Sequence, residues 1–135
     1  MDSETLKSAI ELHDSVLASV GDEGRWVKIK LAPAYIHKSA GIPGIDPGTG
    51  WTQDALLIVE DGAIEGRIIE LPCDLSDGTL QVAGEVLRNV LPLPLDYVGQ
   101  IELTLHFKGD GEIVVRGTRI FAELFGEPTY IEEFN

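Results

Sequence analysis

Residues 101–118, IELTLHFKGDGEIVVRGT, decide the fold class because apolar and polar side chains alternate on both sides of a glycine-rich turn. This period of two is typical of antiparallel strands with one buried face. With positions 109–111 as a three-residue loop, Leu105 lies opposite Val115 on that face. The sequence therefore predicts a β-hairpin. The polar side of this hairpin carries Glu102, Thr104 and His106.

The hairpin pattern degrades at Gly117. Continuing the same register would place Ile101 opposite Arg119, an apolar side chain against a charged one. A glycine inside a strand often marks a bulge or a sharp bend. We therefore predict a bulge or bend at Gly117.

A second hairpin is predicted at Asp61-Gly62, a dipeptide that favours the type I′ turn between two strands. A two-residue turn fixes the register, so that Val59 faces Ile64. The two hairpins together predict a core that includes Leu57, Val59, Leu103, Leu105 and Phe107.

Further elements follow from the same kind of pattern. Val27, Ile29 and Leu31 alternate with lysines in a predicted strand over residues 25–35, where Pro33 requires an edge position or a bulge. Residues 3–10 predict a short helix with Ser3 as a candidate N-cap. Other strands are expected over residues 15–20, 51–60 and 63–71. One or two more are expected over residues 80–91, after a turn at Asp77-Gly78, and the first hairpin is expected to span about residues 98–124.

These elements predict a single all-β domain over residues 1–135, which is an ordinary length for one domain. We expect an antiparallel, barrel-like meander of about seven or eight strands with a short N-terminal helix. A two-sheet β-sandwich is the alternative, because either arrangement hides the edges of the sheet.

The chain has a formal net charge of −13. This charge opposes binding to phosphates, so we expect no nucleic-acid partner. No stretch reaches the roughly 20 apolar residues of a membrane span, and no signal-peptide pattern is present, which predicts a cytoplasmic protein without membrane contact. The single cysteine, Cys73, excludes an internal disulfide and fits no zinc motif.

Few residues fit a catalytic pattern. His13-Asp14 resembles the adjacent pair found in metal phosphohydrolases, but here it precedes a strand, where Asp14 is expected to accept backbone hydrogen bonds. His13, His37 and His106 have no metal-ligand spacing, and no nucleophile motif is present. We therefore predict no catalytic residue, metal site or cofactor. Convergence of His13, His37 and Asp54 would instead indicate an enzyme.

One long segment, residues 38–50 (KSAGIPGIDPGTG), has no periodicity. Its flanks carry Tyr35, His37, Trp51 and Asp54. Aromatic and polar residues at the base of a long Gly/Pro-rich loop often form a binding site. We predict a ligand-binding site at these four residues. The alternative is that Tyr35 and Trp51 only cap the core.

Residues 12–17, LHDSVL, resemble the opening segment of several groups of small bacterial β-proteins without an assigned function, some of which are similar to toxin-immunity proteins. The resemblance implies an all-β fold and a bacterial origin. It transfers no catalytic residue.

Together these observations favour a non-enzymatic binding or protein-interaction module, whose partner would be a protein or a small molecule. A homo-oligomer is compatible with the sequence. One alternative is a small-ligand-binding β-barrel covered by the loop at 38–50, which requires an internal cavity of at least several hundred Å³. Another is an immunity-type inhibitor of a basic toxin, which requires clustered carboxylates on one exposed face.

Overall fold

A computed structural model describes residues 6–68, 70–109 and 111–134, and these residues form an all-β fold, as predicted. They contain ten strands and one short 3-10 turn, η1. The elements are β1 (Lys7–Glu11), η1 (Leu12–Asp14), β2 (Val16–Glu23), β3 (Trp26–Ser39), β4 (Gly48–Glu60), β5 (Ala63–Gly66), β6 (Cys73–Val82), β7 (Glu85–Arg88), β8 (Val90–Leu93), β9 (Asp96–Phe107) and β10 (Glu112–Phe134). No helix in the described residues has the length and hydrophobicity needed to cross a membrane.

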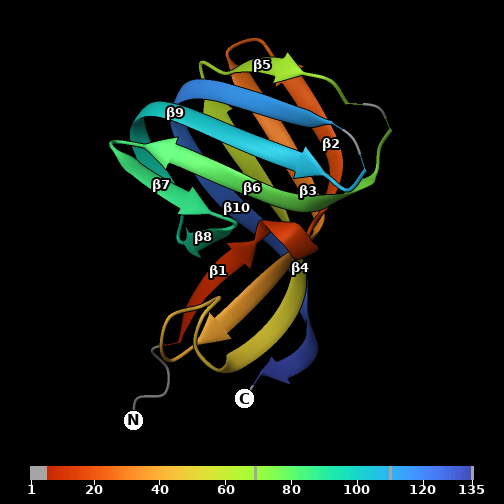
Figure 1. The fold of residues 1–135 in the computed structure, drawn as a ribbon, viewed down its shortest axis with the longest axis vertical. Helices are drawn as coiled ribbons and strands as arrows, with labels where there is room; N and C mark the ends of the chain where they lie inside the picture. The colour runs from red at the N-terminus through yellow and green to blue at the C-terminus, as the bar shows by residue number, and fades with distance from the viewer. Residues whose placement is uncertain (1–5, 69, 110, 135) are drawn as a thin grey trace.

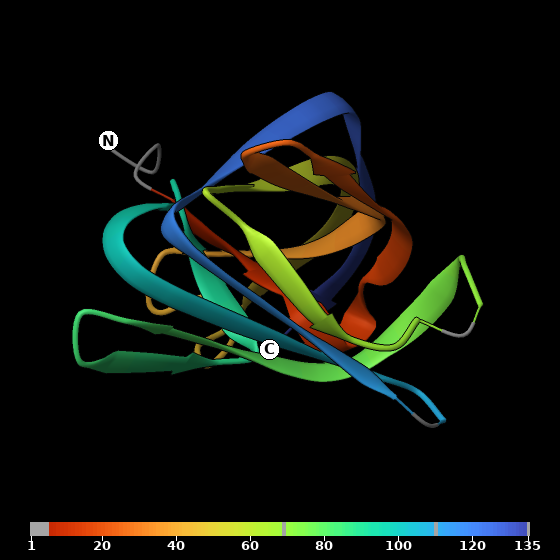
Figure 2. The same ribbon diagram turned by 90° about the horizontal axis from the view of Figure 1, so that it is seen from above.

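The ten strands belong to one antiparallel sheet with the order β2-β6-β9-β10-β4-β3-β1-β8. β2 also pairs with β3, so the strands β2, β6, β9, β10, β4 and β3 form a closed circuit. This circuit gives the barrel-like body in the upper part of Figure 1, seen from above in Figure 2. The prediction of a meander was wrong because strands distant in the sequence pair, such as β4 with β10. The strands are also more numerous than predicted, and they do not form the two sheets of a sandwich.

The inward faces of the body are filled by apolar side chains. The predicted alternation is confirmed in β3, where Val27, Ile29 and Leu31 are buried and the intervening lysines are partly exposed. The predicted core residues are all buried: Leu57, Val59, Leu103, Leu105 and Phe107. The residues predicted on the polar side are all partly exposed: Glu102, Thr104 and His106.

The sheet continues beyond the body as a second region, which we call the extension. It consists of β1, β8 and residues 34–39, 48–53 and 128–134 of β3, β4 and β10. Figure 1 shows most of it below the body, where both ends of the described chain also lie. The long strands β3, β4 and β10 therefore run through both regions.

A bulge in β3 separates the two regions. The register with β4 shifts by one residue between the pairs Leu31↔Ala55 and Ala34↔Gln53. Of the two alternatives predicted for Pro33, an edge position or a bulge, the structure has the bulge. An extra residue reverses the alternation of side chains along the strand. Tyr35 and other odd-numbered residues beyond the bulge consequently point to the outer face of the sheet, whereas those before it point into the body.

The predicted N-terminal helix over residues 3–10 was wrong in its described part. Lys7–Ile10 belong to β1, which pairs with β3 on one side and β8 on the other. Ala9 and Ile10 are adjacent in sequence and both are buried, as in a strand covered on both faces. Tertiary pairing thus overrides the helical spacing of the apolar residues. The proposed N-cap, Ser3, lies outside the described residues.

The hairpin predicted at Asp61-Gly62 was also wrong. β4 already has β3 on one side and β10 on the other, so no side remains on which β5 could pair with it. β5 instead continues along β10, with Ile64 opposite Val115. Asp61-Gly62 is a two-residue break between β4 and β5, which pair one after the other along the same side of β10. A hydrogen bond from the Thr118 hydroxyl to the Asp61 carboxylate (2.9 Å) holds it.

The predicted β9–β10 hairpin exists, but its register was wrong by two residues. Leu105 lies opposite Ile113, and Leu103 lies opposite Val115. Because the shift is an even number, the same residues still face the core. The bulge predicted at Gly117 is confirmed by a register shift there. A side chain at this position would collide with Val59 and with the carbonyl of Glu60, so the close approach of β4 requires a glycine.

Two predicted connections were too long or misplaced. β3 and β4 extend further than expected, so the loop between them covers only residues 40–47 rather than 38–50. Asp77-Gly78 lies within β6 at a register shift and does not form a turn between strands.

Candidate functional site

A pocket of about 280 Å³ lies on the outer face of the extension, between η1, the 40–47 loop and the end of β10. Its volume is at the lower end for ligand sites, which suits a small molecule or a single side chain. Titratable side chains dominate its lining: Glu11, His13, Asp14, Tyr35, His37, Asp46 and Glu132. The ring of Phe134 and residues 44, 45 and 47 of the loop complete it.

Ser15 fixes the position of η1 relative to the sheet. Its buried hydroxyl donates to the carbonyl of Glu11 (2.8 Å) and accepts from the backbone N–H of Tyr35 (2.9 Å). The side chain of Leu12 is fully buried and anchors the turn in the core. The segment LHDS therefore has an anchoring residue at each end, Leu12 and Ser15, and two pocket residues between them, His13 and Asp14.

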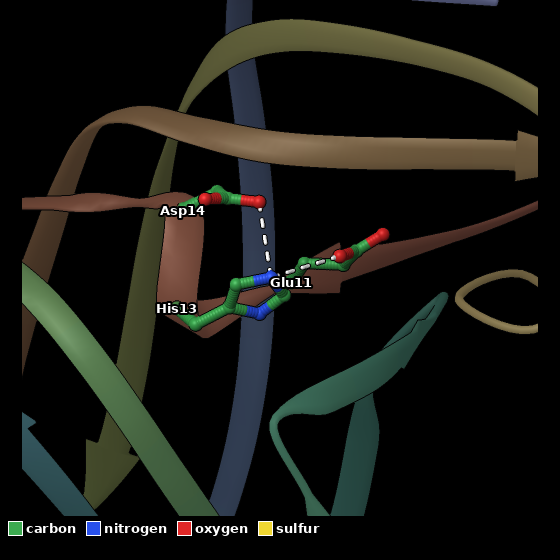
Figure 3. Close-up of side chains that lie close together, drawn as sticks. All are labelled: Glu11, His13 and Asp14. Atoms are coloured by element: carbon green, nitrogen blue, oxygen red, sulfur yellow. Dashed lines mark ion pairs between the residues drawn. The ribbon is translucent and has the colours of Figure 1, made fainter. Parts of the chain in front are cut away.

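His13 lies between two carboxylates, as Figure 3 shows. Its Nε2 atom is 3.0 Å from Asp14 Oδ2 and 3.5 Å from Glu11 Oε1. The expectation that Asp14 would accept local backbone hydrogen bonds is thus replaced by a side-chain contact. The three side chains are close enough to share one metal ion.

The contacts of Asn89 favour a proton rather than a metal ion on the Nε2 atom of His13. Its Oδ1 accepts from the backbone N–H of His13 (2.7 Å), which leaves its Nδ2 facing His13 Nδ1. An amide NH₂ can only donate, so Nδ1 acts as the acceptor and the proton of a neutral imidazole lies on Nε2. A metal would need a free lone pair on that same Nε2. The arrangement therefore suits His13 as a hydrogen-bond donor to Asp14 and Glu11.

His37 is 5% exposed and has two competing neighbours at one ring nitrogen. Its Nδ1 accepts a hydrogen bond from the backbone N–H of Gly44 and lies 3.3 Å from Glu11 Oε2. Its Nε2 has no hydrogen-bond partner among the described residues. Nδ1 can accept from Gly44 only when it carries no proton and can donate to Glu11 only when it carries one, so it cannot serve both neighbours at once. The ring also packs on Phe134, with centroids 4.8 Å apart.

Tyr35 connects the floor of the pocket to β10. Its hydroxyl donates to Glu132 Oε2 at 2.6 Å. Burial is the main cause that raises the pKa of the Tyr35 hydroxyl, and the hydrogen bond to Glu132 and the nearby carboxylates add to it. Tyr35 therefore stays neutral and holds the Glu132 carboxylate in place. A side chain at Gly50 would collide with the Tyr35 hydroxyl, so this glycine gives Tyr35 its space.

The structure separates the four residues predicted as a site. Tyr35 and His37 both line the pocket. Trp51 lies on the opposite face, where it packs against Tyr130 with centroids 5.4 Å apart and under the Lys38 ammonium at 4.6 Å. Asp54 is paired with Phe125 further along β4 and does not line the pocket.

The sequence analysis missed Glu11 and Glu132, which complete the pocket. Glu11 is only two residues before His13, so a search for mixed carboxylate and histidine clusters would have detected it. Glu132 is distant in the sequence and reaches the pocket only because β10 pairs with β4. The predicted convergence of His13, His37 and Asp54 is not found, because Asp54 does not line the pocket. The carboxylate that lies near both histidines is Glu11.

A larger hollow of about 790 Å³ lies beside the β6–β7 hairpin. Most residues that line it are exposed, so it is on the surface rather than inside the body. Its arginine, Arg116, is already paired with Glu102 at 2.9 Å and with Glu65. This hollow therefore contains an arginine, whereas the smaller pocket is lined by carboxylates without Lys or Arg among its described residues.

Comparison with protein-family models, curated protein sequences and solved structures found no significant match. Glu11, Asp14, Asp46 and Glu132 bring four carboxylates to its lining, and none of the described lining residues is Lys or Arg.

Proposed function

We propose that this protein is a non-enzymatic binding module that receives the cationic group of a ligand or partner in the acidic pocket. The observation that carries the proposal is the set of four carboxylates without a Lys or Arg among the lining residues. Outside the pocket, several carboxylates are paired with arginines, as Asp96 and Glu60 are with Arg119. In the pocket, the ion-pair partners of Glu11 and Asp14 among the residues that the structure describes are histidines.

The electrostatics of the pocket support an ammonium or guanidinium group rather than an anion. Glu132 is held by Tyr35, and Glu11 is largely buried beside His37, so two carboxylates have fixed positions before a ligand enters. Preorganised charges bind with a smaller entropy loss than mobile ones. The ring of Phe134 adds an aromatic surface, which also favours cations.

The charge of the pocket also supports a protein partner with basic residues. A net charge of −13 would steer such a partner towards this protein. This is the behaviour expected of an immunity-type inhibitor, which is one form of the proposal. The single cysteine is compatible with a reducing compartment, and we place the protein in the cytoplasm as part of the same proposal.

Calorimetric titration at low salt would test the pocket with Nα-acetyl-arginine amide as the probe. The uncharged isostere Nα-acetyl-citrulline amide is the matched control ligand. We expect the arginine compound to bind at least about fivefold more tightly, equivalent to about 1 kcal/mol. Glu132→Gln should remove most of this preference. Glu85→Gln removes the same charge from the exposed hairpin at β7 and should leave the affinity unchanged.

Equal affinity for both compounds would overturn the proposal, as would an equal loss in the two glutamate variants. Titration with Zn²⁺ provides a separate check on the His13 cluster. If Zn²⁺ binding requires His13 and the arginine compound does not bind, the pocket is a metal site and the proposal fails.

A further inference from the structure

The two lateral edges of the extension differ in how they are protected. β8 forms one edge, and it is only four residues long and contains Pro92, which has no N–H to donate. β10 forms the other edge because its pairing with β9 ends at Phe121↔Asp96. Over residues 123–134, the strand that pairs with β10 within the described chain is β4 alone. Figure 1 shows this end of β10 as the outermost strand beside β4.

This free edge carries exposed apolar side chains, all between 38% and 53% exposed: Leu124, Phe125, Tyr130 and Ile131. Its pairing with β4 shifts register twice, between Phe125 and Thr129, where Pro128 lies, and again between Tyr130 and Glu132, where Ile131 is the extra residue. In the first half, the carbonyl of Gly126 also already accepts from the Gln53 amide (2.8 Å). Residues 129–134 form the longer stretch without a proline. An edge of this kind is a template for an additional strand.

The charge on the free edge decides what kind of strand fits. It carries Glu123, Glu127, Glu132 and Glu133, and no Lys or Arg occurs from residue 120 to 134. A second copy of the same edge would bring glutamates against glutamates, which is unfavourable between neighbouring strands. A strand with basic residues would be attracted instead.

Strand pairing also connects this edge to the pocket. His37, Gly50 and Glu132 lie opposite one another on β3, β4 and β10 and therefore share the outer face of the sheet. The residue of an added strand that lies opposite Glu132 would project from this same face, with its Cβ about 5 Å away. A Lys or Arg at that position would reach the Glu132 carboxylate.

We infer that residues 129–134 of β10 are a docking edge for an extended, basic segment of a partner protein, which pairs its backbone with β10 and places one Lys or Arg side chain on Glu132. The inference rests on the proposed function, because this side chain is the cationic group that the pocket receives. It adds the class of partner and the direction from which it arrives.

The test uses an acetylated, amidated octapeptide of alternating arginine and valine, titrated into the full chain. We expect it to bind at least about tenfold more tightly than Nα-acetyl-arginine amide, because backbone hydrogen bonds add to the ion pair. Two N-methylated versions, one at the arginines and one at the valines, test the backbone. Since alternate N–H groups of a strand point to opposite sides, only one version should retain the tenfold gain.

A matched pair of protein variants locates the edge. Ile131→Lys places a positive charge on the free edge and should weaken octapeptide binding about tenfold. Val98→Lys makes the same change at another exposed apolar residue, on β9, and should have no effect. Thermal melts would verify that both variants are folded.

The outcomes separate this inference from the proposed function. If Nα-acetyl-arginine amide binds but the octapeptide binds no more tightly, or if both N-methylated versions behave alike, strand docking is overturned and the pocket proposal stands. If the octapeptide binds in a strand-like manner but Glu132→Gln has no effect, docking by an added strand stands and the placement of its cation on Glu132 is overturned. Sedimentation that reveals a dimer broken by Ile131→Lys would overturn the inference in favour of a second copy.

Discussion

The barrel-like body and the extension are built from the same long strands but present different chemistry. In the body, β3 directs Val27, Ile29 and Leu31 inwards to a core of buried apolar residues. Beyond its bulge, the same strand directs Tyr35 and His37 outwards into the acidic pocket. One inserted residue therefore separates a stretch that stabilises the fold from a stretch that forms the candidate site.

The comparison shows why bulges matter for function in a sheet protein. Without the extra residue, Tyr35 and His37 would continue the inward series of the body. The bulge allows apolar residues such as Ile36 to keep contact with the core while titratable residues gather on the other face. If this division is correct, substitutions in the body should reduce stability, and substitutions on the outer face of the extension should mainly change binding.

The largest expected effect is in the body. Leu105→Ala removes a fully buried side chain and should cost about 2–5 kcal/mol of unfolding free energy. Thr104→Ala, on the partly exposed side of the same strand, should stay within about 0.5 kcal/mol. Urea denaturation of both variants measures the difference. A larger loss for Thr104→Ala would show that the faces of β9 are reversed.

An intermediate effect is expected at Trp51, on the inner-facing side of the extension. Trp51→Ala removes the contact with Tyr130 and the cation–π contact with Lys38, and should cost about 1–3 kcal/mol. Affinity for Nα-acetyl-arginine amide should be unchanged because the pocket is on the other face. Reduced affinity in a folded variant would show that Trp51 contributes to the site. It would contradict the assignment of binding to the outer face alone.

The smallest expected effect is at Tyr35, within the pocket. Tyr35→Phe removes the hydrogen bond to Glu132, and at neutral pH it should cost about 1 kcal/mol. The pKa of Tyr35 is raised in the folded state, so the unfolded chain ionises first as pH rises through about 10. The wild-type advantage should therefore be fully present below pH 10 and decrease above it. Denaturation series from neutral to alkaline pH measure this, and a constant difference would contradict the assignment.

Much of the fold could be predicted because side-chain alternation is a local property of the sequence. The faces of β3 and β9 and the all-β class were predicted correctly, and the bulges at Pro33 and Gly117 were each one of two predicted alternatives. The pairing of strands was predicted less well. Asp61-Gly62 has the composition of a turn, but both sides of β4 are paired, one with the preceding strand β3 and the other with β10, which is distant in the sequence.

The candidate site was predicted only in part, for the same reason. The flanks of the loop gave Tyr35 and His37, since both are close to it in the sequence. Glu132 joins them from 97 residues away through a hydrogen bond, and no local pattern signals this contact.

The sequence by itself determined which residues can face a core, because apolar and polar side chains alternate along each strand. Only the tertiary structure decided which strands become neighbours, since pairing depends on which edges are still free when all strands are assembled. The acidic pocket depends on both. The sequence supplies its carboxylates and histidines, and the β1-β3-β4-β10 order places them on one face.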